Sequence, residues 1–264
     1  MHRPNIELIQ LRMGTDSTPN PFFHPANDLD KPVNVRALRF VQVDNESILR
    51  SMQPAVFKAA NLRELRIWAD EDSGLVLTTL LANSDGKCPF RLRTLDLRGF
   101  AGLGMPPCSF WDIIKAENIR DLTVVFTGEL HLNECQSFWR ASLDARLRPT
   151  RLSTNLSFPG FSEFLSSFSG LEAFCCMTPM PCPVEPLPCL IQALQRQHSE
   201  TLKILSLTPG ECPVEQTVSL AVAKALCAQF PSMEELRIGL EQPDPVNYPF
   251  VNDMLSQCLL KNSK

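Results

Sequence analysis

The stretch LRTLDLR, at residues 92–98, carries apolar residues at its first, fourth and sixth positions and polar residues between them. Alternation of apolar and polar residues is typical of a β-strand with one buried face. The same L-x-x-L-x-L phrase occurs as LRELRI at 62–67, LKILSL at 202–207 and MEELRI at 233–238. A phrase that recurs in this way predicts a fold built from repeated, strand-containing units.

Weaker copies of the phrase extend the repeat over most of the chain. Nine copies, spaced 24 to 31 residues apart, begin at Ile6, Val35, Leu62, Leu92, Ile119, Leu147, Leu171, Leu202 and Met233. We expect the first, fourth and sixth residue of each copy to point into the core, and Thr150 is the only polar residue at those positions. The fourth positions predict one buried column that includes Leu65, Leu95, Leu122, Leu205 and Leu236.

The segments between the phrases carry apolar residues at helical spacing. This spacing predicts helices at 46–59, 134–146, 186–198 and 216–230, and single turns or 3₁₀ pieces at 111–116 and 163–168. Proline-rich stretches follow the strands at 15–32, 102–107, 178–188, 209–213 and 242–249. Because proline has no N–H donor, we expect these stretches to be loops along one edge of the sheet.

The pattern resembles the leucine-rich-repeat family, in its long, helix-containing form, from residue 6 to about residue 240. The resemblance implies an α/β solenoid, or horseshoe, of about nine irregular repeats, with parallel strands on the concave face and helices outside. The ninth position of the family repeat is usually Asn or Cys, but here only Asn155 fits, with Asp70 a partial substitute. Degenerate repeats of this kind resemble those of F-box leucine-rich-repeat proteins, notably fungal ones.

Length and composition fit one or two ordinary domains, and the repeat register, which resumes after the first four proline-rich stretches, predicts a single domain over residues 1–264. The chain is 44% hydrophobic and 20% charged, and its net charge of -4 argues against general binding to nucleic acid or to a membrane surface. No signal peptide is visible, and the longest apolar run, 218–230, is too short to span a bilayer, so we expect a cytoplasmic or nuclear protein. Nothing before Ile6 could cap a solenoid. We therefore expect a fragment without its N-terminal cap or F-box, or a first strand that packs on something else.

The sequence contains no recognisable catalytic motif. No H-E-x-x-H or G-x-S-x-G occurs, and the Gly-rich turn at 99–104 lacks the order of a phosphate-binding loop. The cluster Cys175, Cys176, Cys182 and Cys189 lacks the spacing of known zinc ligands, so we interpret it as core packing, with a metal or redox role as the alternative. We predict no enzymatic activity, no cofactor and no metal.

Arginines recur at two positions of the repeat. The second position holds Arg36, Arg63, Arg93, Arg120 and Arg148, and the fifth holds Arg39, Arg66, Arg151 and Arg237. Equivalent positions of parallel strands lie side by side, so these residues should form ladders of like charge. Either carboxylates such as Asp96 offset the ladders, or the ladders bind an acidic or phosphorylated protein, because Arg pairs with both groups through two hydrogen bonds.

Trp68 stands just after its strand, next to three acidic residues at 70–72. It either packs under the following loop or is an exposed anchor for a partner. The predicted protein-binding concave face comprises Arg36, Arg39, Arg63, Arg66, Trp68, Arg93, Asp96, Arg120, Arg148 and Arg151.

We interpret the chain as a protein-interaction module. The family resemblance implies the substrate-recognition part of an F-box-type ubiquitin-ligase subunit. One alternative is a regulatory repeat domain of the GTPase-activating type, although that type shows a regular N-x-I-G after the strand, which these repeats lack. Another is a truncated remnant with no partner. The sequence leaves the identity of the bound protein and the oligomeric state open.

Overall fold

The computed structural model of the chain contains two compact units, Met1–Leu147 and Arg148–Lys264. It describes residues 8–12, 35–59, 61–81, 91–127, 132–157, 159–177, 187–208 and 220–238. In these ranges nine strands follow one another along the chain with helices between them, and every strand pairing within a unit is parallel. The predicted α/β class is confirmed, and the alternation is consistent with a leucine-rich-repeat solenoid.

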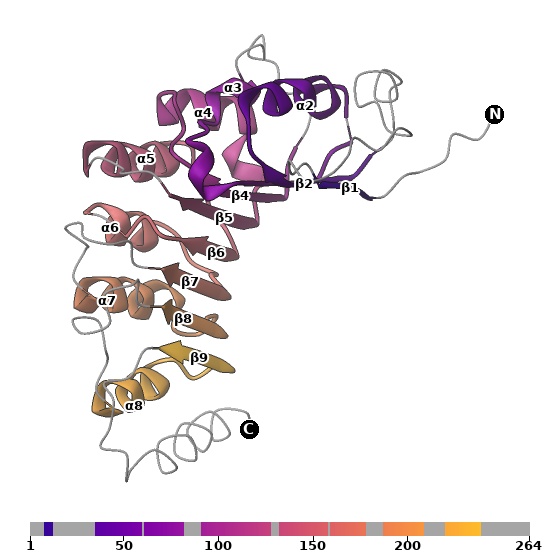
Figure 1. The fold of residues 1–264 in the computed structure, drawn as a ribbon. Coiled ribbons are helices and arrows are strands. Elements are labelled where there is room, and N and C mark those ends of the chain that lie inside the picture. The colour runs from indigo at the N-terminus through magenta and orange to yellow at the C-terminus, as the bar shows by residue number, and fades with distance from the viewer. Residues whose placement is uncertain are drawn as a thin grey trace. The chain divides into compact units, whose positions relative to one another are not determined.

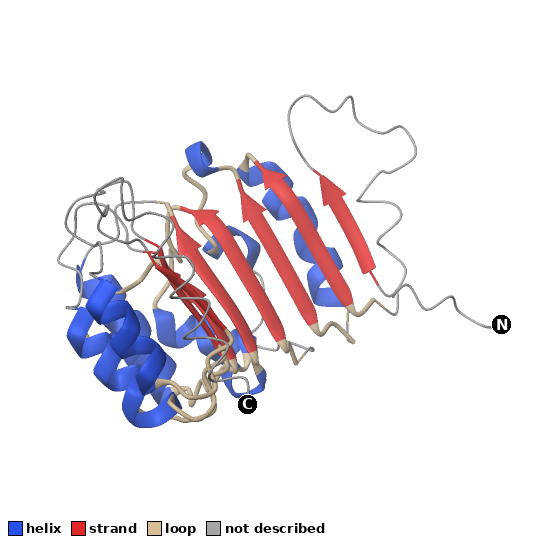
Figure 2. Ribbon diagram, turned by 90° about the horizontal axis from the view of Figure 1, so that it is seen from below, coloured by secondary structure: helices blue, strands red, loops and turns tan. Residues whose placement is uncertain are grey.

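The first unit contains a five-stranded sheet with helices against one of its faces (Figure 2). The strands lie side by side in chain order: β1 (Leu8–Arg12), β2 (Ala37–Val43), β3 (Glu64–Ala69), β4 (Thr94–Phe100) and β5 (Asp121–Phe126). The helices are α2 (Glu46–Lys58), α3 (Thr78–Leu81), α4 (Pro107–Ile114) and α5 (Leu132–Asp144), with 3₁₀ turns η1 (Glu71–Ser73) and η2 (Ala116–Asn118) (Figure 1). We call the other face of this sheet, which carries the third, fifth and seventh residues of the phrase, the open face.

The inward positions of the phrase form stacked columns in the first unit. The fourth residues pair in the order Leu38, Leu65, Leu95 and Leu122, and each is 1% exposed. The sixth residues pair in the order Phe40, Ile67, Leu97 and Val124, and none exceeds 1% exposure. Because parallel strands lie about 4.8 Å apart, each column is a continuous apolar stack.

Local signals set the turns between strand and helix. Asn45 caps α2 because its side-chain oxygen accepts the N–H of Ile48 at 2.9 Å. Gly99, near the end of β4, has φ of +76°, and a Cβ there would lie 2.2 Å from the carbonyl oxygen of Ala69. Only glycine therefore lets β4 pass this close to the end of β3.

The helical predictions are confirmed in the described ranges, with shifted ends for the shorter pieces. Helix α2 and helix α5 fall within two residues of their predicted bounds. Helix α4 starts earlier than predicted because proline is favoured in the first turn of a helix. The α3 and η1 pieces were not predicted, since four and three residues are too short to show a helical period.

The second unit repeats the same design with four strands. They are β6 (Arg151–Thr154), β7 (Ala173–Met177), β8 (Ile204–Thr208) and β9 (Glu235–Ile238), and they pair in chain order. The helices are α6 (Phe161–Ser166), α7 (Leu187–His198) and α8 (Leu220–Gln229). Leu205 and Phe174 are fully buried in the fourth-position column, whereas Leu236 is half-buried, so its predicted burial is wrong.

The predicted register of the sixth copy is also wrong. Leu152 pairs with Phe174 and Thr154 with Cys176, so the inward triplet is Pro149, Leu152 and Thr154, and the copy begins two residues later than Leu147. Leu147 is buried for another reason: it follows α5, and its N–H donates to the carbonyl of Ser142 at 3.0 Å. Thr154 tolerates full burial because its hydroxyl accepts the N–H of Leu156 at 3.0 Å.

Several predictions fall wholly or partly outside the described residues. These are the start of the first copy at Ile6, the beginning of the 216–230 helix, and most of the proline-rich stretches, of which 102–107 is described. That stretch follows β4 and leads into α4, as predicted.

Candidate functional site

A row of arginines lies at the edge of the five-stranded sheet where the strands begin. Arg36, Arg63, Arg93 and Arg120 each stand one residue before a strand, and all four are exposed. We call these four residues the arginine row. These arginines were predicted on the concave face. Each strand, however, starts at the residue after the arginine, so the row lies at the edge of that face.

Main-chain hydrogen bonds hold the row in register. The carbonyl oxygen of Arg36 accepts the N–H of Arg63 at 2.8 Å and that of Glu64 at 3.0 Å. The same paired contact joins Arg63 to Arg93 and Thr94, at 2.7 and 3.0 Å, and Arg93 to Arg120 and Asp121, at 2.8 and 3.0 Å. Each arginine backbone is therefore tied to the next one, about one strand spacing of 4.8 Å away.

The row places four positively charged side chains along one edge of the sheet. In the described part of the chain, no carboxylate forms an ion pair with Arg36, Arg63 or Arg93. An anion bound at the row would offset part of this positive charge.

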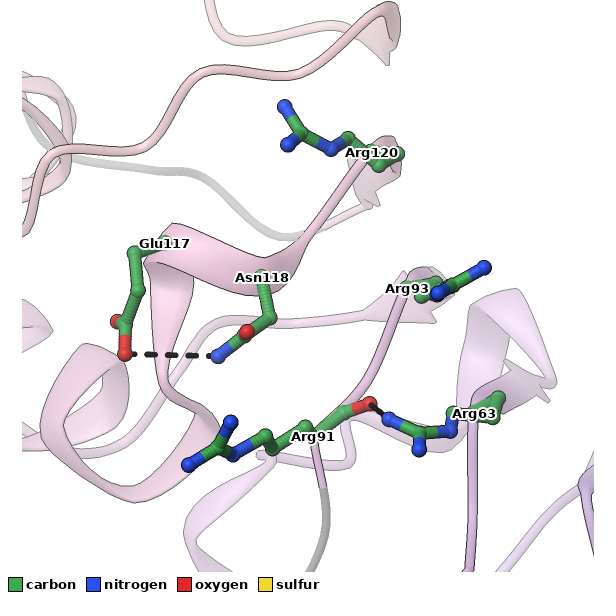
Figure 3. Close-up of a pocket in the computed structure, with 6 residues that line it drawn as sticks. All are labelled: Arg63, Arg91, Arg93, Glu117, Asn118 and Arg120. Carbon is green, nitrogen blue, oxygen red and sulfur yellow. Dashed lines mark hydrogen bonds between the residues drawn. The ribbon is translucent and has the colours of Figure 1, made fainter.

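Two neighbouring cavities open along the row. The first, of 450 Å³, is lined by Arg63, Arg91, Arg93, Glu117, Asn118 and Arg120. Figure 3 shows Arg63, Arg93 and Arg120 at successive strand starts, with Glu117 and Asn118 contributed by η2. The second cavity, of 350 Å³, is lined by Arg36, Asn61, Arg63 and Arg93. Arg63 and Arg93 line both cavities.

Two contacts order the walls of the first cavity. The Nη1 of Arg63 donates to the carbonyl oxygen of Arg91 at 3.3 Å, and the Nδ2 of Asn118 donates to Glu117 Oε1 at 3.4 Å (Figure 3). Of the described residues that line this cavity, Glu117 is the one carboxylate and four are arginines. The described part of its wall is therefore strongly positive.

The arginines of the open face, in contrast, are paired with carboxylates. Glu64 Oε1 accepts from Arg39 Nε at 2.7 Å and from Arg66 Nε at 2.9 Å. Asp96 Oδ1 accepts from Arg98 Nε at 2.8 Å, and its Oδ2 lies 3.9 Å from Arg66 Nη1. Asp96 is 3% exposed and lies between two arginines. On this face, carboxylates offset the positive charge of the arginines.

Trp68 lies within β3 and not just after the strand as predicted, and its side chain is on the open face. It is 36% exposed, and its strand register places it between Val41 and Arg98. The guanidinium carbon of Arg98 lies 5.2 Å from the centre of the Trp68 ring, within the range of a cation–π contact. Trp68 is thus an exposed aromatic, and its role as an anchor for a partner stays a prediction.

The arginine row does not continue at the equivalent position of the second unit. The same paired main-chain contact there runs from Thr150 to Glu172, then to Lys203 and then to Glu234. Arg148 precedes Pro149 and lies outside this series, and Arg151 begins β6 at the third position of its copy. The assignment of Arg148 to the second position and of Arg151 to the fifth was wrong, because both followed from the misplaced register of that copy.

Sequence reasoning missed five residues of these surfaces: Asn61, Arg91, Arg98, Glu117 and Asn118. Arg98 belongs to the phrase at 92–98, and extending the outward positions to the seventh would have found it. Arg91, Glu117 and Asn118 lie before the phrase, in turns that the repeat period does not specify. No sequence signal placed them in a cavity.

The described residues contain no group of three or more His, Cys, Asp or Glu side chains that could hold a metal ion. Cys176 is buried at an inward position as expected, whereas Cys175 is half-buried and Cys189 is exposed, so core packing is wrong for these two; Cys182 lies outside the described residues. None of the described helices is long and apolar enough to cross a membrane. No family model, curated protein or solved structure matches the chain. A functional assignment must therefore rest on the charge and geometry of the site itself.

Proposed function

We propose that this chain is a protein-binding module that captures an acidic or phosphorylated segment of a partner protein through the arginine row. The observation that carries the proposal is the contrast between two sets of arginines on one sheet. Those of the open face have carboxylate partners, whereas Arg36, Arg63 and Arg93 form no ion pair with a described residue. Unpaired arginines in fixed register favour binding of an external anion.

The chemistry of arginine fits such a ligand. A guanidinium group can donate two parallel hydrogen bonds to a carboxylate or a phosphate, so a row of four combines charge with geometric selectivity. The net charge of the chain is -4, so the basic surface is local and does not reflect a generally basic protein. A local patch of this kind favours one acidic segment over nonspecific polyanions.

A finer proposal concerns the biological setting. The repeat length and the degenerate ninth position support the substrate-recognition part of an F-box-type ubiquitin-ligase subunit, in the cytoplasm or nucleus. A regulatory domain of GTPase-activating type is less well supported because the strands lack the N-x-I-G sequence. In each case the chain binds a protein, and we assign no catalytic step to it.

Charge reversal of the arginine row tests the proposal. The variant Arg63→Glu, Arg93→Glu, Arg120→Glu should lose the partners that the wild-type chain captures from cells. Capture by the wild type should weaken as salt rises, because salt screens exposed charges. The matched control Arg151→Glu, Lys203→Glu, Arg237→Glu makes the same charge change in the second unit and should keep the partners.

Circular dichroism and thermal melting must first show that both triple variants are folded. If the folded row variant captures the same partners at full strength, the proposal is wrong. The identity of the captured proteins then distinguishes the two biological settings. Ubiquitin-ligase components would support the F-box-type subunit, and a small GTPase would support the regulatory domain of GTPase-activating type. Capture of no partner by the wild type favours the truncated remnant.

A further inference from the structure

We infer that the two cavities along the arginine row form one site for an extended protein segment that carries two phosphorylated residues, two positions apart in its sequence. This inference rests on the proposed function and specifies its ligand. It follows from the arrangement of the cavities, their total charge and the nature of their walls.

The cavities are neighbours that share two walls. Arg63 and Arg93 line both, while Arg36 closes the row at one end and Arg120 at the other. The residues of the two cavities are offset along the edge by about one to two strand spacings, roughly 5–10 Å. A ligand with two anionic groups at this separation would place one group in each cavity.

An extended segment meets this spacing naturally. Side chains two residues apart in an extended chain point to the same side and lie about 6.6 Å apart. Adjacent side chains point to opposite sides, so two neighbouring phosphates could not both face the cavities without distorting the chain. The pattern that fits best therefore has one residue between the two phosphorylated ones.

The total charge of the site matches two phosphate monoesters. Among the described residues, the lining of the two cavities contains five arginines and one carboxylate, a net charge of +4. Each phosphorylated side chain carries about -1.5 to -2 at neutral pH, so two of them supply about -3 to -4. Two carboxylates would supply about half of this negative charge.

The walls argue against a nucleic acid as the ligand. Single-stranded nucleic acids are held mainly by bases stacked on aromatic side chains, together with contacts to the backbone phosphates. The described residues that line the two cavities are Arg, Asn and Glu, and none of these described lining residues is aromatic. In addition, a phosphodiester carries one negative charge per phosphate, which matches this site less well than a phosphate monoester.

Binding of synthetic peptides to the full chain tests the inference. We would measure fluorescence anisotropy with a labelled nine-residue peptide that contains phosphoserine–glycine–phosphoserine. Matched peptides carry two adjacent phosphoserines, one phosphoserine, two glutamates with the same spacing, or no charge. The peptide with the intervening glycine should bind about tenfold more tightly than the singly phosphorylated one, because the second phosphate gains its own arginine contacts. It should also bind several-fold more tightly than the peptide with adjacent phosphates.

Two single variants separate a built site from a generally basic surface. Arg36→Ala should reduce the affinity for the doubly phosphorylated peptide to about that for the single phosphate, because it opens one cavity only. Glu117→Gln should tighten binding several-fold, because it removes the carboxylate from the other cavity. Glu163→Gln, which removes an exposed carboxylate from α6 in the second unit, should leave the affinity unchanged.

Several outcomes would overturn the inference. One is equal affinity for the single, adjacent and spaced phosphates, and another is equally tight binding of a nine-nucleotide single-stranded DNA. If no phosphopeptide binds but charge reversal of the row still abolishes capture of the cellular partners, this inference is wrong and the proposed function stands. If charge reversal leaves capture intact while the phosphopeptide binds as expected, the proposed function is wrong and the anion site stands.

Discussion

The two compact units carry different side chains at the same position of the same repeat. In the first unit the residue before each strand is arginine from β2 to β5, whereas in the second unit the series is Thr150, Glu172, Lys203 and Glu234. The main-chain contact at this position is the same in both. The backbone of the repeat therefore does not require an arginine at this position.

The exposed faces of the strands in the two units differ as well. The fifth positions of the first unit include Arg39, Arg66 and Asp96, which belong to the ion-pair chain of the open face. The equivalent positions of the second unit hold Ser153, Cys175, Ser206 and Arg237, and Arg237 pairs with Glu235. Inward positions are constrained by packing in both units, while outward positions are free to diverge. The first unit is thus the better candidate for recognition.

The largest expected effect is the loss of stability when a fourth-position leucine is truncated, compared between the two units. Leu95→Ala should reduce the free energy of unfolding by about 2–5 kcal/mol, because it leaves a cavity between Leu65 and Leu122. Leu236→Ala should cost clearly less, since Leu236 is already half-buried. Urea denaturation followed by circular dichroism measures both variants. Equal losses would show that the two columns are equally packed.

A smaller effect is expected from the carboxylates that pair with arginines. Asp96→Ala should cost about 1–3 kcal/mol, because Asp96 is 3% exposed and its loss removes charge-assisted bonds to Arg98. The matched variant in the second unit, Glu235→Ala, breaks an exposed pair with Arg237 and should cost less than about 1 kcal/mol. The same denaturation assay checks both, and a greater loss for Glu235→Ala would contradict the ranking.

The strands were predictable because the repeat fixes the inward residues through packing. Leu95 and Leu97 belong to a phrase whose alternating apolar and polar residues are typical of a half-buried strand. The recurrence of the same apolar triplet in other copies strengthened the prediction of a strand at each of them. The predicted register of the sixth copy was wrong because its inward residue Thr154 is polar. In addition, Leu147, an apolar residue at the end of a helix, was mistaken for the first position of the phrase. A buried hydroxyl with a local acceptor role has no signature in a hydrophobic pattern.

The site was only half predictable for a related reason. The recurrence of Arg36, Arg63, Arg93 and Arg120 is visible in the sequence, and the parallel register then follows from the fold. Which arginines find carboxylates is decided by side-chain geometry across strands, and Glu64 illustrates this by accepting from arginines of two strands. Residues of irregular turns, such as Glu117, line the cavity because the folded chain brings them there, and no sequence pattern predicts this.

Acid should weaken the second unit before the first. His198 is fully buried, its Nδ1 accepts the N–H of Leu171 at 3.2 Å, and its Nε2 lies 3.0 Å from the carbonyl of Leu165. These partners fix the neutral tautomer, and burial lowers the pKa of His198 below its ordinary value of 6.5. Below pH 6.5 the unfolded chain therefore binds more protons than the folded one, so stability falls as the pH decreases.

Hydrogen exchange followed by mass spectrometry locates this effect in the chain. As the pH is lowered from 7 towards 5, exchange corrected for its intrinsic pH dependence should rise in β7 and β8 before it rises in β3 and β4. In the variant His198→Gln, the corrected exchange rates of β7 and β8 should differ less between pH 7 and pH 5 than they do in the wild type. This should hold even if the variant is less stable at pH 7. An equal acid response in both units would exclude His198 as its cause.

The smallest expected effect distinguishes two adjacent cysteines of the second unit. Cys175 is half-buried on the exposed face of β7, while Cys176 points inward and is 2% exposed. Burial raises the pKa of Cys176 to about 12, so its thiolate is scarce at pH 8 as well as shielded. Iodoacetamide at pH 8 should alkylate Cys175 in the folded chain and reach Cys176 only after unfolding. Fragmentation of the peptide that contains both residues shows which of them carries the label.

In the first unit, the exposed Cys108 and the buried Cys135 provide matched controls for accessibility. Rapid labelling of Cys176 with Cys135 still protected would show that the core of the second unit opens independently of the first.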